Sequence, residues 1–244
     1  MIPSRYNGVK RNNGYPNKDI TGRMLILKIA ISDEIKRLCP GAALGVLHYK
    51  ADVTESSEKL LAAFERKLVD LSEAYTLESI AKNPHISATR QAYKALGKSP
   101  HEYRNAAEAM LRRIVKGSGL YHINNVVEVN NYISVSSGYS IGSYDLSGLQ
   151  GNIELRRAQD GAHYEGIGKG AINIEHLPVL YDDLGAFGNP SSDSRRAMLQ
   201  EGRHEILSVI YGFDGREELK PWLRQFSSLL ETYCGVRGME TWIV

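Results

Sequence analysis

The chain has 244 residues, of which 42% are hydrophobic and 24% are charged, and its formal net charge is +2. This composition is typical of a folded globular protein, and the length suits one domain or two closely packed halves. No apolar run approaches the ~20 residues that a membrane-spanning helix needs, so we expect no membrane partner. Cys39 and Cys234 have no metal-ligand spacing, which predicts reduced thiols in a cytoplasmic protein.

Residues 1–22 are polar, rich in glycine and asparagine, and without periodicity, which predicts a flexible N-terminal arm. The alternative is an arm that binds nucleic acid, because the segment from Arg5 to Arg23 contains several basic residues and a single acid, Asp19. The regular pattern begins at Met24, which is therefore a second candidate for the start of the natural chain. We expect a single domain over residues 23–244.

The first half of this domain mixes strands with helices. Apolar runs predict interior strands over Leu25–Ile31 and Ala43–Tyr49, with a short helix capped by Ser32 between them. Helical periodicity then predicts three helices. They are expected over residues 56–81, over residues 87–96 before Gly97, and from Ser99-Pro100-His101-Glu102, a capping box with proline, to Gly117.

The segment from residue 82 to residue 117 is strongly basic. It carries eight lysines and arginines against two glutamates, a net charge of +6 on a chain whose total is +2. Such a block predicts an anionic partner, with Tyr93 and Tyr103 placed to stack on bases. The alternative is an ordinary solvated helix face. The candidate RNA-binding residues are Arg90, Lys94, Lys98, Arg104, Arg112, Arg113 and Lys116.

The stretch from Ile123 to Leu146 predicts a capped helix followed by a polar, glycine-containing extended turn. Asn125 is the expected N-cap, Glu128 completes a capping box, and Gly138 suits the left-handed position after the last turn. The turn carries Gly142, Tyr144 and Asp145. This arrangement can line a pocket, or it can be a core helix with an ordinary turn.

The second half is β-rich, so the chain as a whole is predicted to be an α+β protein. Strands are expected over residues 152–158, 163–168, 205–213 and 240–244. A hairpin turn is expected at Asp160-Gly161, and two short apolar segments are expected on either side of Asp182-Asp183. A helix is expected over Glu217–Tyr233, before Gly235.

Known catalytic signatures and metal-ligand spacings are absent, so we expect no metal and no cofactor. Gly166–Gly170 follows the expected hairpin without opening a helix, which favours a turn over a phosphate loop. The polar loop Gly188–Arg196 is the second candidate pocket wall. It can form an anion-binding nest or a hydrated loop from Ser191, Ser192, Asp193, Ser194 and Arg195.

Several segments in order resemble the B3/B4 domain, the tRNA-binding and editing module of the phenylalanyl-tRNA synthetase beta subunit. They are L-R-R-I at 111–114, G-L-x-x-I-N-N-V-V-E-V-N-N-Y at 119–132, S-I-G-S-Y-D-L at 140–146, I-E-L-R-R-A with D-G after it, and L-G-A-F-G at 184–188. The resemblance spans about residues 111–213. The preceding T-R-Q-A-Y-K-A-L-G and S-P-H-E-Y-R segments resemble free-standing B3/B4-domain proteins.

The resemblance implies β-sandwich-like mixed sheets with flanking helices and an N-terminal helical block. It also implies a pocket, with the family's helix asparagine at Asn131 beside Asn130, its turn aspartate at Asp145, and its first loop glycine at Gly188. The family's editing histidine falls on Gly142 and its strand glutamate near Val209, so these two groups are missing here.

The function that the resemblance implies is binding of tRNA or aminoacyl-tRNA, extended to a trans-acting hydrolase of mischarged aminoacyl-tRNA. If the protein is an enzyme, we expect an aminoacyl-tRNA deacylase and not a ligase, because no aminoacylation domain is visible. The alternative is a module that binds a small amino-acid-like molecule without RNA or catalysis.

Overall fold

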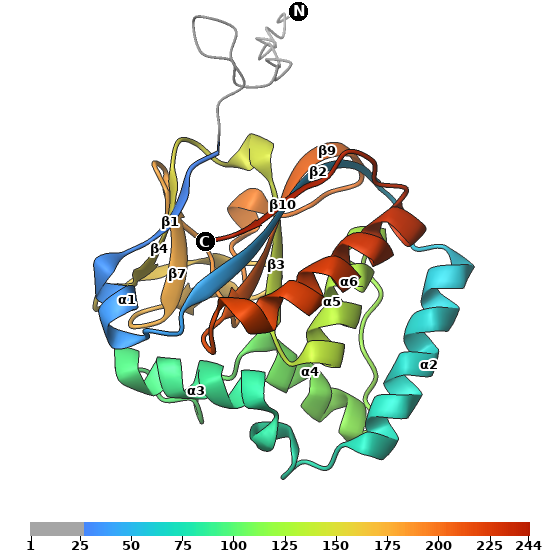
Figure 1. Ribbon diagram of the computed structural model, residues 1–244, viewed down its shortest axis with the longest axis horizontal. Helices are drawn as coiled ribbons and strands as arrows, with labels where there is room; N and C mark the ends of the chain where they lie inside the picture. The colour runs from blue at the N-terminus through green and yellow to red at the C-terminus, as the bar shows by residue number, and fades with distance from the viewer. Residues whose placement is uncertain (1–26) are drawn as a thin grey trace, which may run out of the picture.

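The computed structural model describes residues 27–244, so the predictions for residues 1–22 lie outside the described part. Two four-stranded sheets and their flanking helices make up the fold (Figure 1). The strands are β1 (Ile29–Ile31), β2 (Ala43–Val53), β3 (Ser140–Asp145), β4 (Ile153–Arg157), β5 (His163–Gly166), β6 (Gly170–Asn173), β7 (Pro178–Asp182), β8 (Gly185–Gly188), β9 (Gly202–Gly212) and β10 (Glu240–Ile243). The helices are α1 (Asp33–Leu38), α2 (Glu58–Ala74), α3 (Pro84–Leu96), α4 (Ala106–Val115), α5 (Asn125–Ser137) and α6 (Arg216–Cys234), with 3-10 turns at Ile80–Lys82, Leu146–Gly148 and Arg195–Ala197.

The larger sheet has the strand order β10-β2-β9-β3, and all of its pairs are antiparallel. The second sheet has the order β1-β4-β7-β8, in which β1 runs parallel to β4. Strands β5 and β6 form a separate hairpin. The predicted α+β class, with sandwich-like mixed sheets and flanking helices, is therefore confirmed.

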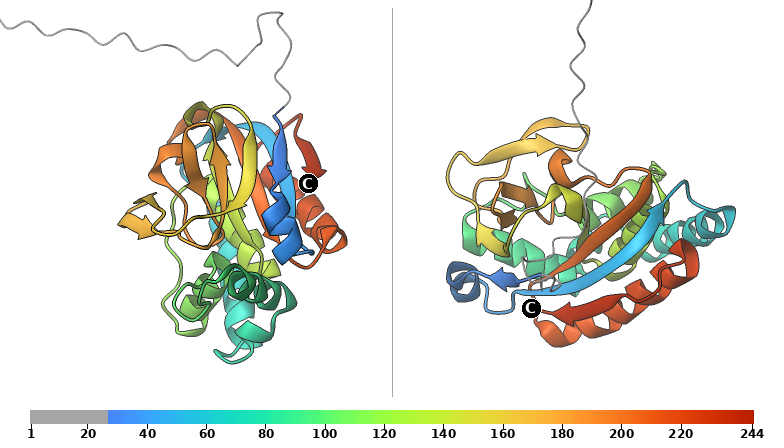
Figure 2. Two further views of the ribbon diagram at one scale, coloured as in Figure 1. Left: turned by 90° about the vertical axis from the view of Figure 1, so that its left-hand side faces the viewer. Right: turned by 90° about the horizontal axis from the view of Figure 1, so that it is seen from above.

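Three of the four apolar clusters of the described residues join the two sheets and the helices. One face of the larger sheet packs on the second sheet through side chains such as Val46, Val209 and Leu155. The other face packs on α5 and α6 through residues such as Leu47, Val129 and Phe226. Figure 2 shows α6 running along the long β2 and β9 strands on this side. A third cluster joins α2, α3, α4 and α5 in the helical block.

Most local predictions agree with the structure, and the exceptions have simple physical reasons. Helix α4 begins after the N-cap Asn105 and not at Ser99, because the Asn105 side chain accepts from Glu108 N while residues 100–102 form a turn. The N-cap of α5 is Asn124 and not Asn125. Asn125 instead bonds to the backbone of Asp52 and Thr54.

The Asp160-Gly161 turn does not close a hairpin, because β4 pairs with β1 and β7 while β5 pairs with β6. The glycines at Gly166–Gly170 form the turn of the β5–β6 hairpin, as the sequence predicts. The predicted polar turn after α5 is the regular strand β3, which pairs with β9 along its whole length. Within residues 27–244 no helix is long and apolar enough to cross a membrane.

Candidate functional site

Tyr144 lies at the centre of the predicted pocket region. Side chains along β3 alternate between the two faces of the sheet, and Tyr144 points from β3 towards the second sheet. Its ring meets Phe187 edge-on at 4.9 Å between centroids. Its hydroxyl donates to Asp193 Oδ1 at 2.7 Å and also lies 2.7 Å from the hydroxyl of Tyr211. The predicted pocket residues Tyr144 and Asp193 are therefore brought together.

Two glycines among the predicted pocket residues leave space for the Tyr144 ring. A Cβ built on either Gly142 or Gly188 would overlap the hydroxyl end of Tyr144. Neither glycine has a positive φ, so space and not backbone conformation requires glycine at both positions. Gly142 is the position to which the family's histidine maps, and the phenol of Tyr144 fills the space beside it.

The loop after β8 is closed by its own hydrogen bonds. The Asn189 side chain accepts from Ser191 N at 2.7 Å and Ser192 N at 3.1 Å. Its amide nitrogen donates to the Tyr164 hydroxyl at 2.6 Å, and that hydroxyl donates to the carbonyl of Ser192. The Ser191 hydroxyl lies 2.8 Å from that of Tyr93. These bonds order the loop, and the anion-binding nest that the sequence offers for it stays a prediction.

Asp193 is the titratable centre of this network. Burial raises the pKa of its carboxyl to about 7, although hydrogen bonds from the Tyr144 hydroxyl and Asn189 N act in the opposite direction. Desolvation also raises the pKa values of the surrounding tyrosines, Tyr93, Tyr164 and Tyr211, so they remain neutral donors. A carboxyl that titrates near pH 7 can accept or release a proton under physiological conditions.

Other predicted pocket residues lie elsewhere. Asn130 packs on the opposite face of β3, where its side-chain oxygen accepts from the Ser143 hydroxyl at 3.1 Å. Asp145 faces the same side and lies 2.8 Å from Nδ1 of His204. Asn131 is partly exposed on α5, and Arg195 is exposed. The strand β3 thus separates Asn130 and Asp145 from Tyr144 and Asp193.

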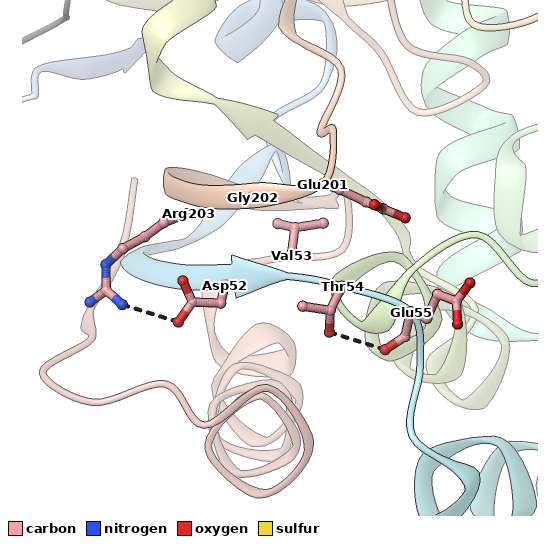
Figure 3. Close-up of a pocket in the computed structure, with 7 residues that line it drawn as sticks. All are labelled: Asp52, Val53, Thr54, Glu55, Glu201, Gly202 and Arg203. Carbon is pink, nitrogen blue, oxygen red and sulfur yellow. Dashed lines mark hydrogen bonds and ion pairs between the residues drawn. The ribbon is translucent and has the colours of Figure 1, made fainter.

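A pocket with a volume of about 500 Å³ lies where β2 ends and β9 begins (Figure 3). Its lining residues are Asp52, Val53, Thr54, Glu55, Glu201, Gly202 and Arg203. Arg203 pairs with Asp52 at 3.0 Å, and no predicted site residue lines this surface. Within residues 27–244 no group of three histidine, cysteine, aspartate or glutamate side chains is placed to hold a metal ion.

Three arginines, on α3, just before α4 and on α4, surround Glu108. This carboxylate is fully buried, and it accepts from Arg90 Nη1 at 2.9 and 3.0 Å and from Arg112 Nε at 3.1 Å. Arg104 Nε lies 3.8 Å away. One carboxylate therefore anchors three guanidinium groups, and an excess of two positive charges remains in the cluster.

The remaining predicted RNA-binding residues differ in exposure. Lys94 and Lys116 are exposed, and Arg113 is partly exposed. Lys98 is buried, donates to Asn173 Oδ1 at 3.0 Å and lies 3.8 Å from the Tyr103 ring centroid. Burial lowers the pKa of Lys98. Among the predicted RNA-binding residues, the accessible charges therefore come from Lys94, Arg104, Arg112, Arg113 and Lys116.

Four members of the Asp193 network are not among the predicted pocket residues. Tyr211 lies in an apolar run, Tyr164 lies in a short strand, and the sequence presents Tyr93 as a base-stacking candidate. Asn189 lies in the polar loop Gly188–Arg196 but is not a predicted pocket residue. Their hydroxyl and amide groups meet because the hairpin, α3 and β9 converge on the loop after β8. The chain's 14 tyrosines are the one compositional hint of such a network.

These features define a protein with a basic helical face and a buried tyrosine–aspartate network between two sheets. The B3/4 domain family matches residues 88–222, more than half of the chain, and the chain belongs to this family. The phenylalanine–tRNA ligase beta subunit of Cutibacterium acnes is 34% identical over 73 residues. That match covers 29% of this chain and 9% of the ligase subunit, so the chain corresponds to a small part of that protein.

Among solved structures, the chain is similar to an N-terminal fragment of the phenylalanyl-tRNA synthetase beta subunit from Pyrococcus horikoshii. The superposition has a TM-score of 0.49 at 11% sequence identity, and it covers 93% of this chain and 53% of the fragment.

Proposed function

We propose that this B3/4-domain protein binds tRNA through the basic face of α3 and α4. The observation that carries the proposal is the cluster at Glu108, where one buried carboxylate holds three arginines. A buried, hydrogen-bonded carboxylate fixes the positions of the guanidinium groups before any ligand arrives. Binding then costs less side-chain entropy than it would for freely moving cations.

The accessible groups of the cluster suit phosphate recognition. Arg90 has a side chain only 17% exposed, and its Nη1 is occupied by Glu108 and by the carbonyl of Pro100. Arg104 and Arg112 have side chains 46% and 27% exposed and contact Glu108 through Nε. Their terminal amino groups are not engaged by Glu108, so they can donate to phosphate oxygens.

Exposed lysines extend the same surface along the helices. Lys116 follows Arg112 by four residues at the end of α4, and Lys94 lies on α3. The name of the similar ligase subunit links that protein to tRNA, which supports tRNA as the anionic partner of this chain.

Cys39 and Cys234 are free thiols, which fits a reducing compartment such as the cytoplasm.

The proposal is for binding and does not include hydrolysis. The space beside Gly142 and Gly188 is filled by the Tyr144 side chain, and the Asp193 carboxyl is engaged by Tyr144 and by Asn189 N. An aminoacyl group could enter there only if the Tyr144 ring moved.

The test is tRNA binding by fluorescence anisotropy over a salt series from about 50 to about 300 mM. We expect affinity to fall steeply with salt, because each neutralised phosphate releases a counterion. Arg104→Glu, Arg112→Glu and Lys116→Glu together should weaken binding more than about tenfold and should reduce the salt slope by about one for each phosphate that is no longer neutralised.

A matched control separates a local site from the effect of net charge. Lys50, Lys59 and Arg224 are exposed basic residues on β2, α2 and α6, and their reversal to glutamate changes the net charge equally. We expect this control protein to bind tRNA nearly as well as the wild type. Equal losses in the two triple variants, or salt-independent binding by the wild type, would contradict the proposed surface.

A further inference from the structure

The loop between α4 and α5, residues 116–124, presents an aromatic and an aliphatic side chain to solvent. Tyr121 is 71% exposed and Ile123 is 61% exposed, the two most exposed large hydrophobic residues in the described part of the chain. Tyr121 packs in none of the apolar clusters of the fold. Folding therefore does not explain why a large aromatic side chain lies at this position.

The backbone of this loop is held at both ends. Arg113 donates from Nε to the carbonyl of Gly119 at 3.1 Å and from Nη2 to the carbonyl of Ser118 at 3.2 Å. At the other end, Ile123 N donates to the buried Glu128 carboxylate at 2.8 Å. These contacts fix the place from which Tyr121 projects, so its ring is presented to solvent from a defined position.

The guanidinium group of Arg113 lies 4.8 Å from the centroid of the Tyr121 ring. A cation at this distance is attracted by the electron-rich face of the ring and restrains its orientation. An aromatic ring has two faces, and the high exposure of Tyr121 leaves ring surface free for a flat ligand. The charge next to this ring is that of Arg113, and Lys116 is three residues further along the chain, at the C-cap of α4.

An exposed aromatic ring beside a fixed guanidinium group has the chemistry of a site for single-stranded nucleic acid. Bases stack on the ring because every base has a π-face, while neighbouring cations contact the phosphates. A base in a double helix is already stacked on both sides, so such a site selects unpaired nucleotides.

We infer that Tyr121 stacks with an unpaired RNA base, and that Arg113 and Lys116 contact the phosphates on either side of that nucleotide. The inference rests on the proposed function, because it places a single-stranded part of the bound tRNA against this loop. It assigns a base-contacting role to Tyr121 and separates this contact from the Glu108 cluster, whose arginines contact phosphates alone.

Anisotropy with three labelled RNAs tests the assignment: a tRNA transcript, a ten-nucleotide oligouridine and a blunt RNA duplex. Tyr121→Ala should weaken binding of the tRNA and the oligouridine about tenfold, the loss typical of one stacked base. Binding of the duplex should change less than about twofold, because its bases are already stacked. Tyr121→Trp retains a stacking surface and should bind all three RNAs like the wild type.

Leu184→Ala is the matched control, because Leu184 is also highly exposed, at 58%, but lies in the turn between β7 and β8. It should leave all three affinities unchanged. The inference is overturned if Tyr121→Ala binds tRNA and oligouridine like the wild type, or if Tyr121→Trp is as weak as Tyr121→Ala. An equal loss on the duplex would also overturn it.

The experiment separates the inference from the proposed function. A wild-type protein that binds oligouridine in a Tyr121-dependent manner but does not bind tRNA would contradict the proposed function and support the stacking site. A wild-type protein that binds none of the three RNAs would overturn both. If the Tyr121–Ile123 surface instead serves a protein partner, tRNA binding will be insensitive to Tyr121→Ala.

Discussion

The hydroxyl of Tyr144 donates a 2.7 Å hydrogen bond to the carboxylate of Asp193, and this contact joins strand β3 to the loop after β8. It places a neutral phenol against a carboxyl whose pKa burial raises to about 7. The same hydroxyl lies against Gly142 and Gly188, so the two glycines and the two polar residues form one unit. The unit occupies the region where the family resemblance implies a pocket.

Tyr144→Phe removes the donor but keeps the ring. We expect a loss of about 1–3 kcal/mol in the free energy of unfolding, because the Tyr211 hydroxyl loses its buried partner and Asp193 keeps only the hydrogen bond from Asn189 N. Removal of this hydrogen bond should also raise the pKa of Asp193 further, since the bond favours the ionised carboxylate. Denaturant unfolding and NMR titration of the Asp193 carboxyl carbon are the measurements, and an unchanged pKa would contradict the expected coupling.

Gly142→Ala places a methyl group where the Tyr144 hydroxyl end lies. The ring must move away from Asp193, and we expect a cost of about 1–3 kcal/mol, as for other overpacked cores. Gly45→Ala is the control on β2, because a Cβ there meets its nearest neighbours at 3.4 Å, an ordinary contact. Thermal unfolding of both variants should show a clear loss for the first and little change for the second. Equal stabilities would show that the space beside Gly142 is free.

Asp193→Asn should change how stability depends on pH. The folded protein keeps the Asp193 proton up to about pH 7, whereas an unfolded aspartate loses it near about pH 4. The folded state therefore binds more protons between these values, and its free energy of unfolding falls as the pH rises through this window.

The variant does not have this pH-dependent contribution, so its stability relative to wild type should increase from about pH 4 to about pH 7 and then stay level. Urea unfolding of both proteins at several pH values across and above this window provides the comparison. A stability difference that is constant over this range would be evidence that Asp193 is ionised throughout.

Glu108→Gln tests the carboxylate that organises the basic face. It leaves Arg90 partly buried without its ionic partner, so we expect a loss of about 3–5 kcal/mol in stability. It should also disorder Arg104 and Arg112 and weaken tRNA binding despite the more positive net charge. Glu102→Gln makes the same charge change at an exposed residue and should alter neither property. If Glu108→Gln binds tRNA more tightly than Glu102→Gln, the fixed positions of the arginines do not contribute.

Local sequence signals predict most helices and strands correctly where the residues that form an element also mark its ends. Helix α6 ends at Gly235 and α5 at Gly138, both in the left-handed conformation that glycine permits. Ser32 caps α1 by accepting from Ile35 N. Such bonds join residues a few positions apart, so the chain specifies them before the fold forms.

The tertiary structure alone decided which polar groups meet. Asn130 and Tyr144 belong to neighbouring elements but lie on opposite sides of β3, because side chains alternate along a strand. A shift of β3 by one residue would reverse this, and its register depends on pairing with the distant strand β9. Likewise, the sequence predicts Arg90 as a phosphate contact, and that role stays a prediction, while the structure pairs this residue with Glu108. Composition and periodicity thus determined the α+β class and the basic segment, whereas the partners of Asp193 and Glu108 depend on contacts between residues far apart in the chain, which no local pattern specifies.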